Sequence, residues 1–537
     1  MVRGSALWGL TLPSLVFVPA LAWSSVVDDF SGANLNFDNW RFYDDSVDVY
    51  ERVRVVDPKA GRVHLGVAAE GGQGIRRSTL TPVATDREAL EATLAVDDLV
   101  VGDNEDDFSA LRVEGSYYNA EGTEATSEDL TGDVFAYVAL GDFGEGVRGW
   151  WGILQSENAD FSNFQVIEVG GFSGAEFESG ASYPARLAYD GDRTFEFSLN
   201  GATTIIEGPP RAGDAGAPFH RFNAVTQAES GVGRVRGTVS GPIVDDDVVS
   251  YDNFEETALE PLLWAEPVRA RGTVDGRLQL GVQGNDLDAD YMDRRQEGLY
   301  LKGIDNPEFM EVDVSISSAS ALDTGVLAMG GLTGYVYNAR RDGGDQAMAY
   351  DGADGDVWAS VRLALHGDGT MGAVARVETS LSDFSTDGSP LLEQSFTEPL
   401  ELDTEYTLSI ERREDEIVLG LNDETIIHEV ETPMYEPSPT ALNGYRRLLA
   451  QVSGVPSGGG GSGVAFATFD NVSTAPSAGA EDDDGQPGGS GETGASGSGS
   501  SSGGCSVLGH GGGAEVPFVA VLLMLLWRAS RRAGRLW

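Results

Sequence analysis

An internal duplication constrains the fold of this chain more than any other feature. Residues 115–120 read Gly-Ser-Tyr-Tyr-Asn-Ala and residues 334–339 read Gly-Tyr-Val-Tyr-Asn-Ala, at an offset of 219 residues. Further similar segments recur in the same order at nearly the same offset, namely 61–67 with 276–282, 132–136 with 355–359, and 160–162 with 383–385. The sequence therefore predicts one domain type used twice, over residues 23–243 and 247–474.

The pattern of apolar residues in both copies is that of β-strands. Val63, Leu65 and Val67 alternate with polar residues and glycine, as do the apolar residues of 195–199, which precede Asn200-Gly201. Asn-Gly between two alternating runs favours a tight type I′ hairpin, because both residues accept positive φ. Helical periodicity is not evident in either copy. We therefore expect an all-β protein with two tandem antiparallel β-sandwiches, each long enough to bury its own core.

The composition excludes several partners and bonds. The chain has 35 basic and 86 acidic residues, a formal net charge of −51, which repels phosphate backbones, so nucleic acid is not an expected partner. Cys505 is the single cysteine, so the chain forms no internal disulfide and no thiolate metal cluster.

The two ends of the chain predict export and attachment. Residues 1–22 contain Arg3, an apolar run and a final Ala-Leu-Ala, which indicates a cleaved secretory signal; an uncleaved anchor is the alternative. Residues 475–504 are rich in Gly, Ser and acidic residues and predict a disordered linker. In 505–537, an apolar run over 516–527 precedes an arginine cluster, which predicts a short transmembrane helix with a cytoplasmic C-terminus.

The end of the chain resembles the myxobacterial C-terminal sorting tag known as MYXO-CTERM. The matching residues are Gly504, Cys505, the apolar run and the arginines Arg528, Arg531 and Arg532. This resemblance implies processing near Cys505 by a membrane sorting protease and delivery to the outer surface of a Gram-negative bacterium. An ordinary C-terminal anchor with an incidental cysteine is the alternative.

Each copy resembles the concanavalin A-like lectin/glucanase jelly roll. The likeness rests on Phe30 with Trp40, on Phe254 with Trp264, on the Gly-Arg-Val/Leu-x-Leu-Gly-Val strands and on the closing segment 469–472. It implies a two-sheet sandwich whose concave face, in many relatives, binds or cleaves glycans.

A catalytic acid pair of the laminarinase type is not found. Such members carry Glu-x-Asp-x-Glu on one strand, whereas Glu311-Val312-Asp313 is followed by Ser315 and Ile316 where the second glutamate should stand. Glu91 opens the corresponding segment of the first copy, which matches less well. We therefore expect no catalysis.

Two sets of acidic residues are candidates for calcium ligands. Asp286, Asp288, Asp290 and Glu297 have part of the spacing of a calcium loop, but Tyr291 occupies the position that needs glycine, so an acidic surface turn is favoured. A calcium site formed by other aspartates in turn-like segments remains an alternative; these are Asp133, Asp190, Asp192, Asp354 and Asp356. No other cofactor is expected.

Trp150 and Trp151 are candidates for stacking against sugar rings, although neighbouring tryptophans on a strand more often divide between core and rim. The sequence thus predicts an exported, surface-anchored, non-catalytic protein that binds polysaccharide or cell-surface glycan, or mediates adhesion. The alternatives are a secreted glycoside hydrolase or lyase and a structural envelope or stalk protein.

Overall fold

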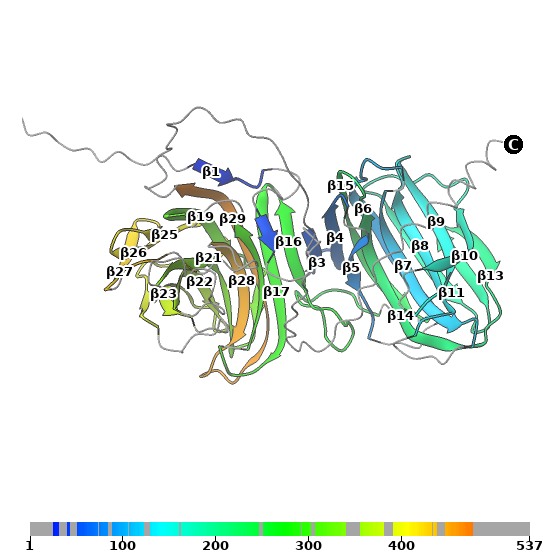
Figure 1. Ribbon diagram of the computed structural model, residues 1–537. Helices are drawn as coiled ribbons and strands as arrows, with labels where there is room; N and C mark the ends of the chain where they lie inside the picture. The colour runs from blue at the N-terminus through cyan, green and yellow to red at the C-terminus, as the bar shows by residue number, and fades with distance from the viewer. Residues whose placement is uncertain are drawn as a thin grey trace, which may run out of the picture.

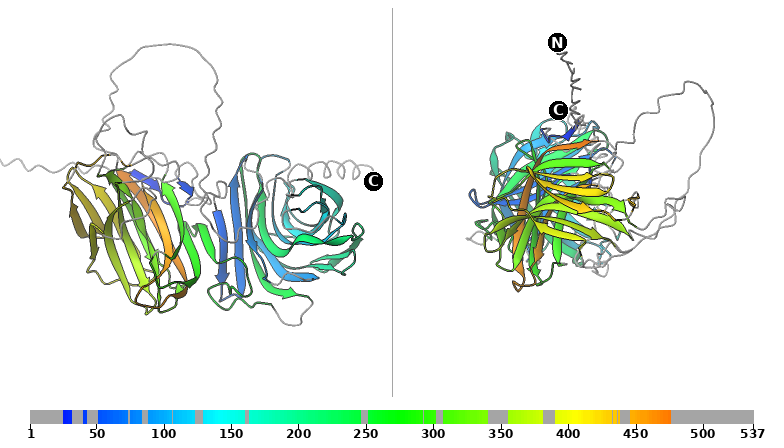
Figure 2. Two further views of the ribbon diagram at one scale, coloured as in Figure 1. Left: turned by 60° about the horizontal axis from the view of Figure 1, so that its bottom comes forward. Right: turned by 90° about the vertical axis from the view of Figure 1, so that its left-hand side faces the viewer.

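The computed structural model confirms the all-β prediction. It describes residues 25–31, 40–42, 51–72, 75–83, 88–105, 107–122, 129–159, 163–245, 251–291, 293–301, 307–339, 355–380, 390–431, 433–435, 437 and 446–475. The described residues contain no helix, and their strands form two lobes that lie side by side (Figures 1 and 2). Each lobe packs two antiparallel sheets around a hydrophobic core.

The first sandwich contains the strands between residues 51 and 244. They are β3 (Glu51–Asp57), β4 (Arg62–Glu70), β5 (Ile75–Leu80), β6 (Ala89–Val100), β7 (Phe108–Asn119), β8 (Asp133–Asp142), β9 (Val147–Ser156), β10 (Phe164–Gly171), β11 (Ser182–Tyr189), β12 (Thr194–Leu199), β13 (Ala202–Glu207), β14 (Gly213–Gln227) and β15 (Val232–Val244). One of its sheets has six strands in the order β10-β9-β8-β7-β14-β5. The hairpin of β12 and β13 turns at Asn200 and Gly201 with φ of 53° and 76°, as the sequence predicts.

The second sandwich repeats this plan. Its strands are β16 (Arg269–Val274), β17 (Arg277–Leu287), β18 (Arg294–Leu301), β19 (Phe309–Ile316), β20 (Ala321–Leu322), β21 (Val326–Asn338), β22 (Asp356–His366), β23 (Met371–Thr379), β24 (Leu392–Ser395), β25 (Tyr406–Arg412), β26 (Glu416–Leu421), β27 (Glu424–Glu429), β28 (Arg447–Gly454) and β29 (Gly461–Ala475). Its separate sheet has the order β2-β18-β28-β21-β22-β23-β24, in which β2 (Trp40–Phe42) comes from the start of the chain.

One 16-stranded sheet runs through both sandwiches, and β3 and β16 are its junction. The two strands are antiparallel, with Val53 opposite Ala270 and with Arg54 and Arg52 opposite Arg269 and Arg271. Because β3 and β16 are equivalent strands of the two copies, this pairing relates the sandwiches by a local pseudo-two-fold axis. Figure 1 shows both strands between the two lobes.

Ion pairs and hydrogen bonds to carbonyl oxygens engage the arginines of this junction. Glu297 is 1% exposed and binds both Arg269 and Arg271, the latter at 2.7 Å. Arg54 donates to the carbonyl oxygens of Pro267 at 2.7 Å and Thr79 at 2.6 Å, and burial lowers its pKa to about 10. Removing one partner would leave a buried charge uncompensated, which is destabilising, so these contacts favour the observed register.

The first strand of the chain does not pack on the first sandwich. β1 (Ser25–Asp28) pairs with β29, and β2 pairs with β18, so Phe30 and Trp40 lie in the second core. Figure 1 shows β1 beside β29. Conversely, Phe254 and Trp264 lie in the first core, and Trp264 bridges to Pro82 beyond the end of β5.

We call residues 25–31 with 40–42, and residues 251–268, the two arms; each begins a predicted repeat and packs on the other one. The ranges 23–243 and 247–474 remain a description of the sequence repeat. In space, the exchange of arms means that each sandwich is completed by residues from the other range.

The same local structure forms in each arm. Asp28 accepts hydrogen bonds from the Phe30 amide at 2.8 Å and from Trp40 Nε1 at 2.7 Å, and the two rings stack at 5.7 Å. Asp252 makes the equivalent bonds at 2.8 and 2.6 Å, and its rings also stack at 5.7 Å. Phe30 has a φ of 50°, a strained conformation for this residue type that the aspartate turn holds in place.

The exchange predicts which strands are destabilised when an arm tryptophan is removed. Trp40→Ala should cost about 3 to 5 kcal/mol and should reduce amide hydrogen-exchange protection in β17 to β29, while β4 to β15 keep theirs. Trp264→Ala is the matched control and should show the opposite pattern by mass spectrometry. Loss of protection within each tryptophan's own repeat would contradict the exchange.

Candidate functional site

The six-stranded sheet of the first sandwich has a polar and aromatic face directed away from the large core. Alternate residues of its strands, such as Leu111 and Val113, enter the large core, and the residues between them form the opposite face. We call this side of the sheet the first outer face. Its partly exposed members are Trp150, Phe219 and Arg221, and the others are buried. The face is defined by Phe108, Ala110, Arg112, Glu114, Ser116, Phe135, Tyr137, Ala139, Trp150, Leu154, Phe219, Arg221, Asn223 and Val225.

Glu114 lies at the centre of this face. The strand register places it between Tyr137 on β8 and Arg221 on β14. Arg221 Nε donates to its carboxylate at 2.6 Å, and the Asn223 amide donates to the same oxygen. Burial raises the pKa of Glu114, but the charges of Arg221, Arg77 and Arg112 outweigh this effect and hold it below its ordinary value. Glu114 is therefore an ionised hydrogen-bond acceptor at neutral pH.

Arginines of this face are held against aromatic rings. The Arg112 guanidinium carbon lies 4.8 Å from the Phe108 ring centre and 5.0 Å from that of Tyr137. Arg221 lies 4.2 Å from the ring of Phe219. Arg112 is 2% exposed, burial lowers its pKa, and its Nε and Nη2 have no hydrogen-bond partner. The face therefore holds a planar, fixed donor between buried aromatic rings.

The two neighbouring tryptophans point to opposite sides of β9. Trp150 belongs to the first outer face, is half-buried and packs edge-on against Phe143 at 4.4 Å. Trp151 is 6% exposed and stacks on Phe197 in the core at 5.2 Å. Strand alternation thus leaves Trp150 as the one member of the pair on this face, and its stacking against a sugar stays a prediction.

Sequence reasoning missed Arg112, Glu114, Arg221 and Asn223. The available signal was the alternation in Arg-Val-Glu at 112–114 and Arg-Phe-Asn at 221–223, which places polar groups on the face opposite an apolar one.

The carboxylates considered for catalysis lie elsewhere. Glu311 and Asp313 are on β19, in the 16-stranded sheet. Glu311 accepts a hydrogen bond from Ser473 at 3.0 Å, and Asp313 accepts bonds from Thr407 at 2.6 Å and Asn471 at 2.9 Å. Glu114 is the single carboxylate among the residues that define the first outer face, so these described residues form no pair of acids.

The four residues of the candidate calcium loop do not come together. Asp286, Asp288 and Asp290 are exposed, whereas Glu297 is buried with both carboxylate oxygens on the junction arginines. The spacing failed as a guide because Glu297 lies within β18, so its side chain is fixed by the sheet.

Other aspartates considered for calcium have structural partners. Asp133 accepts a hydrogen bond from Asn119 at 2.9 Å, and Asp356 accepts one from Asn338 at 2.6 Å. Asp190 accepts the Asp192 amide at 2.9 Å, and Asp354 lies outside the described residues. Over the described part of the chain, no group of three or more His, Cys, Asp or Glu residues is placed to hold a metal ion.

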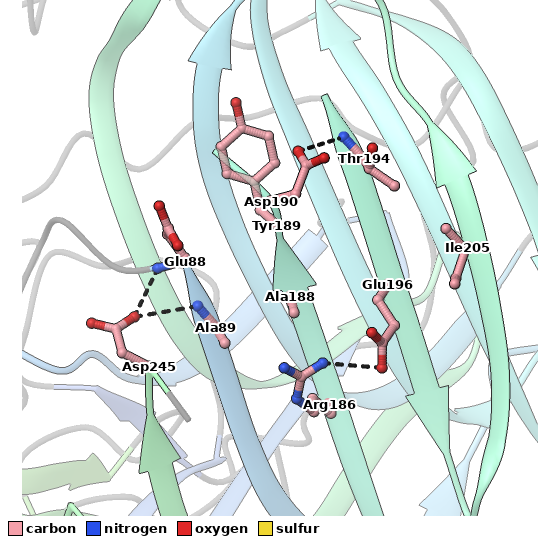
Figure 3. Close-up of a pocket in the computed structure, with 10 residues that line it drawn as sticks. All are labelled: Glu88, Ala89, Arg186, Ala188, Tyr189, Asp190, Thr194, Glu196, Ile205 and Asp245. Atoms are coloured by element: carbon pink, nitrogen blue, oxygen red, sulfur yellow. Dashed lines mark hydrogen bonds and ion pairs between the residues drawn. The ribbon is translucent and has the colours of Figure 1, made fainter. Parts of the chain in front are cut away.

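A hollow of about 300 Å³ lies on the 16-stranded sheet (Figure 3). Its polar side chains are engaged with the protein: Asp245 accepts the Glu88 amide at 2.8 Å, Asp190 accepts the Thr194 amide at 2.9 Å, and Arg186 pairs with a neighbouring glutamate at 3.1 Å. These bonds hold turns and strand ends together. The hollow differs in this from the first outer face, where Nε and Nη2 of Arg112 have no acceptor among the described residues.

The predicted sorting residues Gly504, Cys505, Arg528, Arg531 and Arg532 lie outside the described residues, as do 1–22. None of the described segments forms a helix of the length and apolarity needed to cross a membrane.

Comparisons with known proteins give fold-level likenesses only. No protein-family model and no curated protein matches the chain. Among solved structures, a β-glucanase of Bacillus licheniformis matches with 12% identity and a TM-score of 0.24, over 38% of this chain and 80% of that one. The LG4-5 domains of the mouse laminin alpha1 chain match with 11% identity and a TM-score of 0.21, over 72% and 88%. The alginate lyase Aly36B matches with 15% identity and a TM-score of 0.23, over 38% and 81%. Identities and scores this low support no inference about activity.

The lowered pKa of Glu114 predicts an acid-dependent stability term. Glu114→Gln should lower the free energy of unfolding by an amount that is constant above about pH 4.5 and shrinks as the pH falls through the lower pKa of the folded state, where wild type also loses the charge. Denaturant titrations from pH 3 to 7 measure it. The matched control is Glu168→Gln, an exposed glutamate of β10. An equal difference at every pH would contradict the pKa assignment.

Proposed function

We propose that the chain is a non-catalytic protein of the cell surface whose first sandwich binds carbohydrate through the first outer face. The observation that carries the proposal is the combination of fixed planar hydrogen-bonding groups with aromatic rings in adjacent rows of one sheet. Sugars offer hydroxyl groups to the former and C–H surfaces to the latter.

The fixed geometry of the polar groups supports recognition. Glu114 is held by Arg221 and Asn223, and Arg112 is held between two rings, so little side-chain entropy is lost when a ligand binds. The adjacent row carries Trp150, since Ala139 lies opposite both Arg112 and Trp150 in the strand register. A sugar ring on Trp150 would therefore lie beside the row that holds Arg112 and Glu114, which are 2% and 1% exposed.

Binding without hydrolysis is favoured by the electrostatics of the face. An acid catalyst must be protonated at the working pH, whereas the arginines keep Glu114 ionised. Since the face-defining residues provide no second carboxylate, the two-carboxylate route has no support there.

A binding experiment tests the role of Trp150. The full chain should bind at least one member of a panel of immobilised polysaccharides. Trp150→Ala should weaken that binding about tenfold, equivalent to about 1.4 kcal/mol. Trp150→Phe, which keeps an aromatic face, should retain most of it, and Ile205→Ala, an exposed change on β13, should retain all of it. Absence of binding, or equal binding by Trp150→Ala, would overturn the proposal. Release of reducing ends or unsaturated sugars would favour the hydrolase or lyase alternative.

Surface display rests on the sequence of the two ends. The predicted signal at 1–22, the linker at 475–504 and the tag at 505–537 support export and attachment, with the membrane and a sorting protease as partners. Cys505→Ser should leave the thermal unfolding of the chain unchanged and prevent its appearance on the surface, as measured by antibody labelling of intact cells. Unchanged labelling would contradict the sorting role, and abundance at the surface without binding would favour a structural stalk.

A further inference from the structure

The second sandwich has an equivalent face with different chemistry. One row crosses six strands of the seven-stranded sheet and consists of Tyr300, Arg447, Thr333, Ser360, Arg376 and Glu393. We call this row, together with Arg294, Trp358, Arg362, Val374 and Glu378, the second outer face. Like the first, it lies opposite the residues that enter the core.

Arg362 lies at the centre of this face, and no carboxylate of the described residues forms an ion pair with it. Its guanidinium carbon is 4.5 Å from the ring centre of Trp358, and Nη1 is 3.8 Å from the sulfur of Met329. A thioether is a weak acceptor. Nε is buried and has no hydrogen-bond partner. Arg362 therefore has hydrogen-bonding capacity that the described protein groups do not use.

The surroundings of Arg362 are positively charged. Arg294, Arg376 and Arg447 lie near it and Glu378 is the nearby acid; burial first, and then Arg447, lower the pKa of Arg362 to about 9. Glu378 and Glu393 both pair with Arg376. The four arginines and two glutamates leave two positive charges on this face of a chain whose net charge is −51.

The two outer faces differ at several equivalent positions of the strand register, and three of them change the chemistry around Arg362. Counting from the bulges that the strand register places after Ser116 and Tyr335, Arg362 takes the place of Ala139 and Arg376 that of Gly152. Val374 takes the place of Trp150. The second face has therefore exchanged an aromatic platform for two arginines, while Trp358 supplies an aromatic ring at a different position.

We propose that the second outer face binds an acidic oligosaccharide, with a carboxylate or sulfate group on Arg362 and a sugar ring against the aromatic surface beside it. This is a second site, distinct from the one around Trp150. Arg447 is already oriented by Thr333 Oγ1 at 2.8 Å and by the Tyr300 hydroxyl at 3.3 Å, which leaves Arg362 as the principal anion ligand. A planar guanidinium on a ring suits a carboxylate or sulfate.

The net charge of the chain favours a short or sparsely charged ligand. At physiological ionic strength, charges beyond about 8 Å are screened, so a few acidic groups meet mainly the local arginines. A densely charged polyanion would extend over the acidic remainder of the protein and be repelled.

Titration calorimetry with the full chain tests the site. Trigalacturonate should bind at least tenfold more tightly than its methyl ester, which has the same sugars without the charges. Arg362→Met should reduce acid binding to the level of the ester, and Arg362→Lys should retain part of it. The matched control is Arg295→Met, because Arg295 is exposed and paired with Asp293 at 2.9 Å.

The outcomes separate the explanations. Equal affinity for acid and ester, no binding of either, or an unchanged affinity in Arg362→Met would overturn the proposal; the ester comparison in wild type remains decisive if the variant fails to fold. Inorganic sulfate binding as tightly as the sugar would show a site for free anions and would also overturn it. Trp150→Ala should leave this binding unchanged, so failure here and failure of the first face are distinguishable.

Discussion

The packing of each arm tryptophan into the core of the other sandwich is the interaction on which the rest of the structure depends. Trp40 and Trp264 are each 2% exposed or less, and each is anchored by an aspartate that also shapes its own turn. Because each core is closed by residues of the other repeat, separating the sandwiches would open both cores. The β3 to β16 junction, with its buried arginines on Glu297, adds a polar constraint on register to this apolar one.

Much of the local fold follows from the sequence. The alternation of 63–67 and the division of Trp150 from Trp151 follow from the period of a β-strand. The Asn200-Gly201 turn follows from the tolerance of both residues for positive φ. The duplication also predicts two similar sandwiches. These are properties of short segments, whose conformation the local sequence determines.

The arm exchange and the first outer face depend on contacts between distant segments. Both cores offer an equivalent place for a Phe and Trp pair, so the motif itself does not say which core Trp40 enters; the chain path and the junction decide. Glu114 meets Arg221 across 107 positions of the sequence, which only the register of β7 with β14 defines. The calcium spacing failed for a similar reason, since the partners of Glu297 lie on β16.

Two related sandwiches thus carry two different faces on separate sheets, an aromatic one around Trp150 and a basic one around Arg362. The shared 16-stranded sheet and the exchanged arms join the two sandwiches. Disulfide trapping tests that exchange most directly, in a Cys505→Ser background. Ser25 lies opposite Thr474, so cysteines at these positions should form an intrachain disulfide that peptide mapping detects. Val244 occupies in β15 the place of Thr474 in β29, and cysteines at Ser25 and Val244 should stay reduced. A disulfide to position 244 instead of 474 would contradict the account.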